Sequence, residues 1–573
     1  MTFHQVRLHH KPLLGALLLT AMLAACGEND DLQAGQPATG AGKQYVSLTF
    51  TMPAEEGGSR AAGNPTGGEN GDGHEMGQDY ENTISTAVAF FFQNNRAGVN
   101  GDASTPVQYM FFNSFEKTGD GNDSGIDRTY TSKPVPTDLY GAYNVLVVAN
   151  PGSDWWTTKT TLGEVRDEVL KQAWTGEAGK ESYFLMSSAA DATIQISDAN
   201  NTEATAANTK INVERMAARV DYKTLNSYTI EEDEDYKGAT VEIKGAILVN
   251  NLTLPGSYAM KRVSTATTDG TINYLGDETL GTNGLPNNWV LDPTTGSKKS
   301  EASFGVSWKD PNAIDPNWWS KKVTVDKTIT KKDGDWNILG YTLENITARD
   351  ETKHDYNTAV VFKAKFHPVG LQNYQDGATF FELNKKIYAS MEDMIADFYD
   401  KNIDAEVTAC TSWEDVEDLA SDLKGIDPSG YKQWLQGQID ESKTLDDVMK
   451  NSLTWTSYML NECGYSATLE NGVYTVKINQ GDKITANILA EYGARTYEEA
   501  TCYYTWWIRH ANDDKEETNG VMEYAIVRNN IYELNVESIY SLGGYIPNEE
   551  EKGFIVNVYV KDWTLLKGET IQM

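Results

Sequence analysis

The sequence has little of what enzymes, metalloproteins and disulfide-bonded proteins are built from. It holds four cysteines, and three of them, Cys410, Cys463 and Cys502, lie far along the chain without Cys-x-x-Cys spacing. An odd number in that arrangement indicates neither a disulfide framework nor a zinc site. None of the seven histidines lies in an HExxH motif, and GxSxG and Walker spacings are absent. We therefore predict no catalytic residues, no metal site and no cofactor.

Positive charge and long apolar runs are also scarce. The chain has 48 Lys and Arg against 83 Asp and Glu, a formal net charge of −35. Phosphates would meet a surface of their own sign, which argues against nucleic acid and anionic membrane surfaces as partners. Beyond the N-terminus no apolar run approaches the ~20 residues of a membrane span. Near Asp120 the sequence imitates half of a calcium loop, but Thr131 stands where the bidentate Glu belongs, which favours an ordinary turn.

The N-terminus has the pattern of an export signal. Arg7 and Lys11 precede the apolar residues 13–22, and Leu-Ala-Ala-Cys follows at residues 23–26. Residues 1–25 are therefore predicted to be a lipoprotein signal peptide, with Cys26 as the lipidated first residue. A plain secretory signal with an incidental cysteine is the alternative.

The stretch that follows alternates apolar and polar residues. Between Gln44 and Pro53 the polar positions are Ser and Thr, and the apolar positions are Val46, Leu48, Phe50 and Met52. This period of two predicts a strand that buries one face.

A solvated run then leads to Arg60 and Ala61, the bond that an Arg-specific protease would cut. Residues 26–60 are therefore predicted to be a propeptide with a removable strand. Loss of that strand would leave an apolar groove for another strand to fill.

The remaining chain is rich in strand patterns and exceeds the size of one hydrophobic core. We predict an N-terminal domain at residues 61–220 and a C-terminal domain at 221–573, with the passage between them at residues 211–222. Residues 162–174 have helical spacing. A helical insert is expected at about residues 392–500, with capping boxes at Ser412 and Thr444.

A second one-faced strand is predicted at the far end of the chain. Its apolar positions are Phe554, Val556, Val558 and Val560. It is either an edge strand of its own domain or a donor strand, at about residues 553–573, for a second subunit.

The sequence resembles the fimbrillin family of type V pilus shaft subunits, the short-fimbria branch in particular. The resemblance is carried by YVSLTFTMP with the Arg60–Ala61 junction, YNVLVVANP, FLMSS, VERMAARV, TAVVFKAKFHP, YYTWWIRHAND, VRNNIYELNVESIYSLG and VNVYVKDW, whereas residues 392–500 depart from the pattern. Membership would imply a mostly β fold of two β-sandwich-like (transthyretin-like, Greek-key) domains. It would also imply lipoprotein export, cleavage by an Arg-specific, gingipain-like protease, and polymerisation by strand exchange.

From these features we expect a structural fimbrial subunit. Its partners would be other copies of itself, accessory anchor and tip subunits, the Arg-specific protease and, through the lipid, transiently the outer membrane. It would lie in a fimbrium on the cell surface, and its precursor would be an outer-membrane lipoprotein. Two alternatives stay open: a tip adhesin that binds glycan or host protein, and an uncleaved, monomeric glycan-binding lipoprotein.

Overall fold

The structure of this protein is a computed structural model. It describes residues 43–51, 74–93, 101–118, 129–171, 173–174, 183–188, 191–253, 256–260, 292–293, 303–309, 327–331, 334–346, 354–394, 397, 412–415, 418, 433, 436–437, 465–470, 473–478, 493–510, 523–547 and 553–564.

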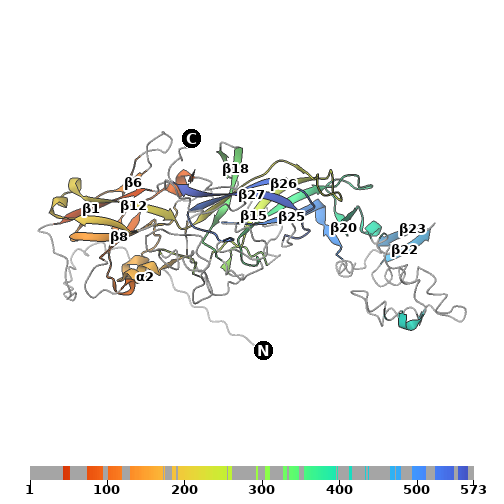
Figure 1. Ribbon diagram of the computed structural model, residues 1–573, viewed down its shortest axis with the longest axis horizontal. Helices are drawn as coiled ribbons and strands as arrows, with labels where there is room; N and C mark the ends of the chain where they lie inside the picture. Colours follow the sequence, from red (N-terminus) through yellow and green to blue (C-terminus); the bar gives the residue numbers. More distant parts are fainter. Residues whose placement is uncertain are drawn as a thin grey trace, which may run out of the picture.

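The described residues form two β-rich domains placed end to end (Figure 1), as the mostly β prediction required. The strands of the N-terminal domain are β1 (Gln44–Thr51), β3 (Ala87–Phe92), β4 (Gln108–Phe112), β5 (Phe115–Thr118), β6 (Thr129–Ser132), β7 (Val135–Thr137), β8 (Gly141–Ala149), β10 (Met186–Ser188), β11 (Ala192–Ile196) and β12 (Ala207–Arg215).

These strands form two groups that share one core. The pairing order is β4-β3-β8-β10-β12-β1-β6-β5, with β11 on β8 and β7 on β1. Strand β12 joins the two groups, because its first six residues pair with β1 and its last three pair with β10. Phe50 from one group and Val147 from the other are both fully buried in the same apolar cluster. The domain is therefore sandwich-like.

The chain passes to the C-terminal domain at Met216 and Ala217. These residues follow β12 and precede β13 (Ala218–Lys223), which pairs only with C-terminal strands in the described part of the chain. Both are fully buried. The passage lies inside the predicted stretch of residues 211–222, but the first domain ends a few residues before the predicted boundary at 220.

The C-terminal domain packs a six-stranded sheet against a four-stranded one. The six strands are, in order, β17 (Lys327–Lys331), β18 (Gly334–Thr342), β13, β26 (Asn530–Ile539), β27 (Phe554–Thr564) and β2 (His74–Met76). The four are β14 (Tyr228–Thr229), β15 (Thr240–Val249), β19 (Ala359–His367) and β25 (Thr501–Trp507). Smaller pairs and a triplet are β9 (Val169–Leu170) with β16 (Ser257–Tyr258), β20 (Phe380–Leu383) with β21 (Lys386–Tyr388) and β24 (Arg495–Tyr497), and β22 (Tyr465–Glu470) with β23 (Val473–Ile478).

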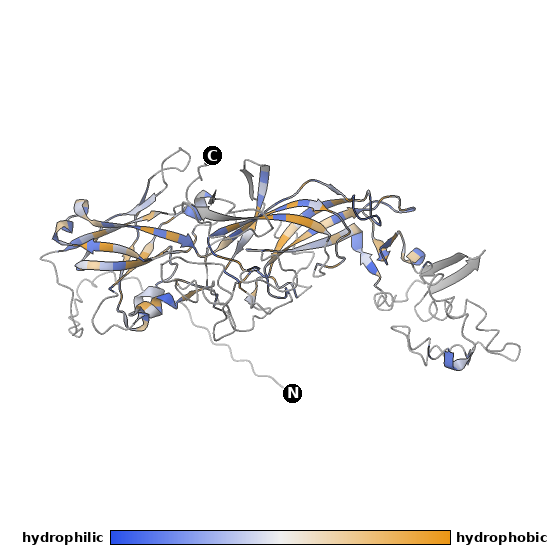
Figure 2. Ribbon diagram, viewed as in Figure 1, coloured by the Kyte–Doolittle hydropathy of each residue, from blue (hydrophilic) through white to orange (hydrophobic). Residues whose placement is uncertain are grey.

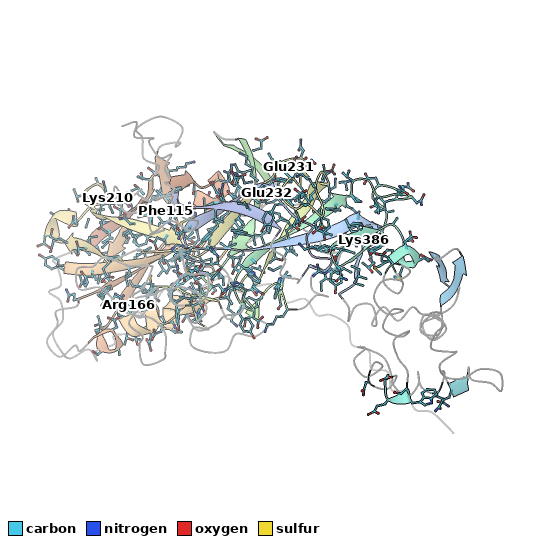
Figure 3. The ribbon with its side chains drawn as sticks, turned by 45° about the vertical axis from the view of Figure 1, so that its right-hand side comes forward. Phe115, Arg166, Lys210, Glu231, Glu232 and Lys386 are labelled. Carbon is cyan, nitrogen blue, oxygen red and sulfur yellow. The ribbon has the colours of Figure 1, made fainter. Side chains whose placement is uncertain are left out.

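Apolar side chains lie between these sheets, and charged ones gather on the outside. Figure 2 shows apolar residues concentrated on the strands of both domains. In the C-terminal domain Val220, Phe362 and Val558 come from three different strands and share one buried cluster. Lys210 and Glu231, both labelled in Figure 3, are exposed.

Helices in the described parts are short. Helix α1 spans Asp79–Asn82, and α2 spans only Leu162–Arg166, so the predicted helix at residues 162–174 is wrong beyond its first turn. Val169 and Leu170 instead form β9 and pair with β16. The start was correctly placed, because Thr161 and Glu164 form a capping box. Among the residues described, no helix is long and apolar enough to cross a membrane.

The predicted insert ends earlier than residue 500. Ser412 and Asp415 make the expected capping box, and Thr444 lies outside the described residues. Arg495–Tyr497, however, is strand β24 on β20, and Tyr497 is fully buried. The Tyr497 ring stacks on Phe380 at 4.6 Å, and its hydroxyl donates to the Gly543 carbonyl at 2.9 Å. Residues from Arg495 onward therefore belong to the C-terminal core.

Two deletions are expected to behave differently for that reason. Replacing residues 398–492 with a short Gly/Ser linker should leave the midpoint of thermal unfolding nearly unchanged. Replacing residues 393–500 should lower it strongly, because emptying the Tyr497 site alone costs about 3–5 kcal/mol. Circular dichroism melts of the two proteins check this. Insoluble protein from the shorter deletion would show that the insert supports the core.

Candidate functional site

Strand β1 occupies an interior position in the N-terminal sheet. On one side it pairs in parallel with β12, from Val46 opposite Ala207 to Thr51 opposite Asn212. On the other side it pairs antiparallel with β6 and β7. Both of its edges are therefore hydrogen-bonded, although it comes first among the described strands.

The inner face of β1 is fully buried. Val46, Leu48 and Phe50 each expose 0% of their surface, in the alternation that the sequence predicts. The Phe50 ring lies 5.5 Å from that of Phe115 on β5. Met52 lies outside the described residues. Burial of three large apolar side chains contributes roughly 4.5–9 kcal/mol, at ~1.5–3 each.

The outer face of β1 carries hydroxyl groups. The Asn208 side-chain amide donates to Ser47 Oγ at 2.9 Å and to Thr49 Oγ1 at 3.1 Å. The Leu48 backbone N–H points to the break between β6 and β7, where it donates to Ser132 Oγ at 2.9 Å. Side chains of neighbouring strands thus complete the pairing of β1.

A single stretch of chain connects β1 to the strands that follow it. Residues 52–73 separate it from β2, which already belongs to the C-terminal sheet. Arg60 and Ala61 fall in that stretch, and Cys26 precedes β1, so all three lie outside the described residues. One cut within residues 52–73 would leave β1 held by noncovalent contacts alone.

Strand β27 is part of its own domain. It pairs antiparallel with β26 from Phe554 to Asp562, and Phe554, Val556 and Val558 expose 6%, 2% and 0% of their surface. The side chain of Val560 lies outside the described set. Of the two alternatives for this strand, the structure agrees with a strand of its own domain, because the two sheets of the C-terminal domain close over these side chains. A donor strand would be poorly packed in the monomer.

The described residues include no group of three or more potential metal ligands. Cys502 is a free, buried cysteine on β25, and burial raises the pKa of its thiol to about 12. A thiol with that pKa stays protonated and is a poor nucleophile. The calcium-like stretch after Asp120 falls among the residues left undescribed.

A cluster of buried charges at the junction of the domains was not predicted from the sequence. Glu81, Arg219 and Asp221 are fully buried, and so is Arg215. The signal was present in VERMAARVDY, where charged residues interrupt an apolar strand pattern. Such residues are seldom buried unless paired, so the pattern could have indicated an internal ion pair.

Comparison with known proteins connects the chain to fimbrial subunits. Residues 495–569 match the family model described as major fimbrial subunit protein type IV, fimbrillin, C-terminal. That segment contains β24 to β27 and so covers much of the C-terminal core. No curated protein sequence gives a match to the chain.

Among solved structures, a putative cell adhesion protein from Bacteroides eggerthii is similar at 10% identity and a TM-score of 0.34, covering 92% of this chain and 98% of its own. A fimbrilin from Porphyromonas gingivalis is similar at 12% identity and a TM-score of 0.30, covering 92% and 99%. The tip fimbrial protein Mfa3 from the same species gives 9% identity and a TM-score of 0.30, covering 91% and 100%. The C-terminal region of the chain, residues 495–569, thus matches the C-terminal model of the fimbrillin family.

Proposed function

We propose that this protein is a structural subunit of a cell-surface fimbria, which polymerises when a strand of a second copy replaces β1. The precursor is exported as a lipoprotein through Cys26 and is cut after Arg60. The observation that carries the proposal is the position of β1. It is an interior strand of a sheet, yet one cut in residues 52–73 separates it from every later strand.

Departure of β1 would open a groove that a new strand can fill. Its walls would be the freed edges of β12 on one side and of β6 and β7 on the other. Each ladder hydrogen bond regained contributes ~0.5–1.5 kcal/mol, in addition to the apolar burial. An open edge of this length also pairs readily with other chains.

The groove restricts the strand that can enter. A replacement that restores all contacts must run parallel to β12 and present apolar side chains at the positions of Val46, Leu48 and Phe50. Small polar residues between them would meet Asn208. This is β-strand addition, in which backbone pairing gives affinity and alternate side chains give specificity.

The donor strand comes from the C-terminal end of the chain. Within the predicted donor range of residues 553–573, the side chains of Phe554, Val556 and Val558 already fill their own core. They cannot fill a second groove without emptying the first, a loss of roughly 4.5–9 kcal/mol at ~1.5–3 per side chain. We therefore place the donor segment after Thr564.

The N-terminus of surface material tests the proposal. Polymers isolated from cells should begin at Ala61, as measured by mass spectrometry of their N-terminal peptides. The uncut precursor should begin at a lipid-modified Cys26. Polymers that retain Cys26 would contradict the proposal, and a surface protein found only as a lipidated monomer would favour a glycan-binding lipoprotein.

A further inference from the structure

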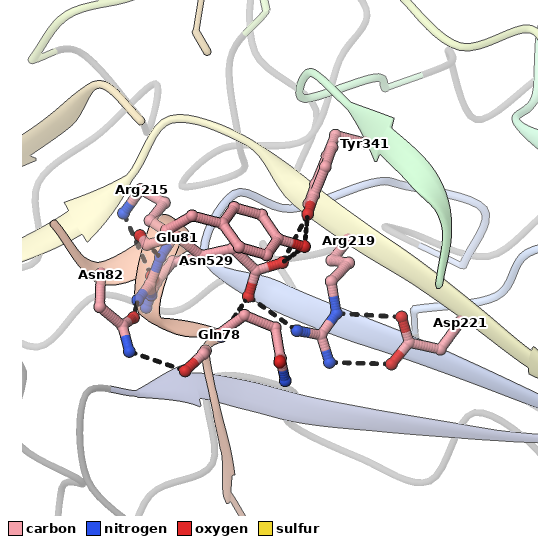
Figure 4. Close-up of polar contacts among 10 residues, drawn as sticks. Gln78, Glu81, Asn82, Arg215, Arg219, Asp221, Tyr341 and Asn529 are labelled. Carbon is pink, nitrogen blue, oxygen red and sulfur yellow. Dashed lines mark hydrogen bonds and ion pairs between the residues drawn. The ribbon is translucent and has the colours of Figure 1, made fainter. Parts of the chain in front are cut away.

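The buried charges at the domain junction surround Glu81 of helix α1. Figure 4 shows this cluster, which comprises Glu81, Asn82, Arg215, Arg219, Asp221, Tyr341 and Asn529 and is called the junction cluster below. Its members come from α1, from β12 and β13 on either side of the domain passage, from β18, and from the turn before β26. It therefore joins both domains to the residues that follow the predicted cut.

Both carboxylate oxygens of Glu81 are engaged. Oε2 accepts from Arg219 Nη1 at 2.8 Å and from the Gln78 backbone N–H at 2.6 Å. Oε1 accepts from the Tyr341 hydroxyl at 2.5 Å and lies 3.4 Å from that of Tyr80. Glu81 thus connects its own helix to β13 and β18 through a side chain that exposes 0% of its surface.

The two arginines complete the junction cluster. Arg219 makes a two-pronged ion pair with Asp221, at 2.9 and 2.8 Å. Arg215 donates to the Glu81 carbonyl at 3.0 Å, to the Asn82 side chain, and to Asn529 Oδ1 at 3.2 Å. Glu81 and Asp221 balance the two guanidinium groups, so the formal charge of these four residues is zero.

This balance makes each member depend on the others. Burial acts to lower the pKa of Arg219, but Asp221 and Glu81 together raise it well above its usual value. Removing one partner of a buried pair leaves an uncompensated charge, which is strongly destabilising. A single change at Glu81 should therefore free the segment that carries it.

Glu81 follows residues 52–73, the stretch in which the predicted cut lies. From this position we infer that the junction cluster is a clasp, which keeps residues 78–82 fastened between the two domains when β1 leaves. This inference rests on the proposed function and extends it. Strand β1 leaves, whereas residues 78–82 stay bound to both domains. The clasp would also keep the two domains fixed relative to each other while the groove is open.

Hydrogen exchange measured by mass spectrometry tests this inference on the full-length lipoprotein in detergent. The protein is compared before and after treatment with an Arg-specific protease, as wild type and as Glu81→Gln. The matched control is Glu232→Gln, because Glu232 is exposed. After the cut, peptides covering residues 78–82 should stay protected in the wild type and the control. In Glu81→Gln they should exchange at least about 10-fold faster.

Two results would overturn the clasp. One is equal protection of residues 78–82 in wild type and Glu81→Gln after the cut. The other is loss of protection at residues 78–82 in the cut wild type. This result does not depend on whether Glu81→Gln folds. The proposed function is tested on a different peptide, because residues 44–51 must lose protection on cutting if β1 leaves. Protection lost at both peptides contradicts the clasp alone, and protection kept at both contradicts the proposed function alone.

Discussion

The Arg60→Ala protein is expected to fold, to be exported and to carry lipid on Cys26, yet to form no polymer. Without the cut, β1 stays covalently attached and keeps its place between β12 and the strands β6 and β7. An incoming strand would have to displace a covalently attached competitor that already fills the groove. Effective concentrations for such attached segments reach the millimolar range, which a strand from another molecule does not match at the cell surface.

The measurement for Arg60→Ala is the ladder of SDS-stable oligomers on gels of unheated surface material. A matched control is Arg96→Ala, because Arg96 is also followed by alanine but lies after β3. The control should polymerise like the wild type. Ladders that persist in Arg60→Ala, built of protein that still begins at Cys26, would remove cleavage from the assembly mechanism.

Two strands at opposite ends of the chain show how much of the fold can be predicted from the sequence. The period of two correctly identified the buried faces of β1 and β27, because Leu48 and Val556 are both buried as the alternation requires. The same pattern could not tell which core each strand fills. Alternation of apolar residues indicates that one face of a strand is buried. It does not identify the residues that bury that face, which lie far away in the sequence, as Phe362 does for Phe554.

Local signals also failed where tertiary contacts decided the structure. The helical spacing of residues 162–174 was real for one turn, but Val169 and Leu170 gain strand pairing with β16 and leave the helix. Arg495–Tyr497, which the prediction placed inside the insert, is too short to produce a period of its own. Pairing of these three residues with β20 is a long-range contact that no local pattern reports.

The junction cluster is a different case. The charged residues in its strand are visible in the sequence, but the sequence does not show that they are buried. Arg215, Arg219 and Asp221 stand in a strand pattern that a solvent-facing edge would also produce. Their burial depends on a partner, Glu81, which is more than 100 residues away in the sequence. Nothing in the sequence of its four-residue helix distinguishes Glu81 from an exposed acidic residue.

Truncation after Glu550 is expected to unfold the C-terminal domain. It removes β27, whose residues Phe554, Val556 and Val558 are buried between the two sheets. At ~1.5–3 kcal/mol for each side chain, the loss of roughly 4.5–9 kcal/mol rivals a domain's total stability of about 5–15 kcal/mol. It also leaves β26 with an open edge and exposes Tyr504 and Trp506, which pack against Phe554.

A stop after Thr564 is the matched comparison, because it keeps every described residue of β27 and removes only residues 565–573. Its thermal midpoint should equal that of the intact protein, while its SDS-stable oligomers should disappear, since the donor segment is placed in those residues. Thermal melts and gels of the two truncated proteins give the answer together. If the stop after Thr564 polymerises normally, the donor segment lies elsewhere. If the stop after Glu550 melts like the intact protein and only its oligomers are lost, β27 contributes little to its own domain and is itself the strand that a second copy receives.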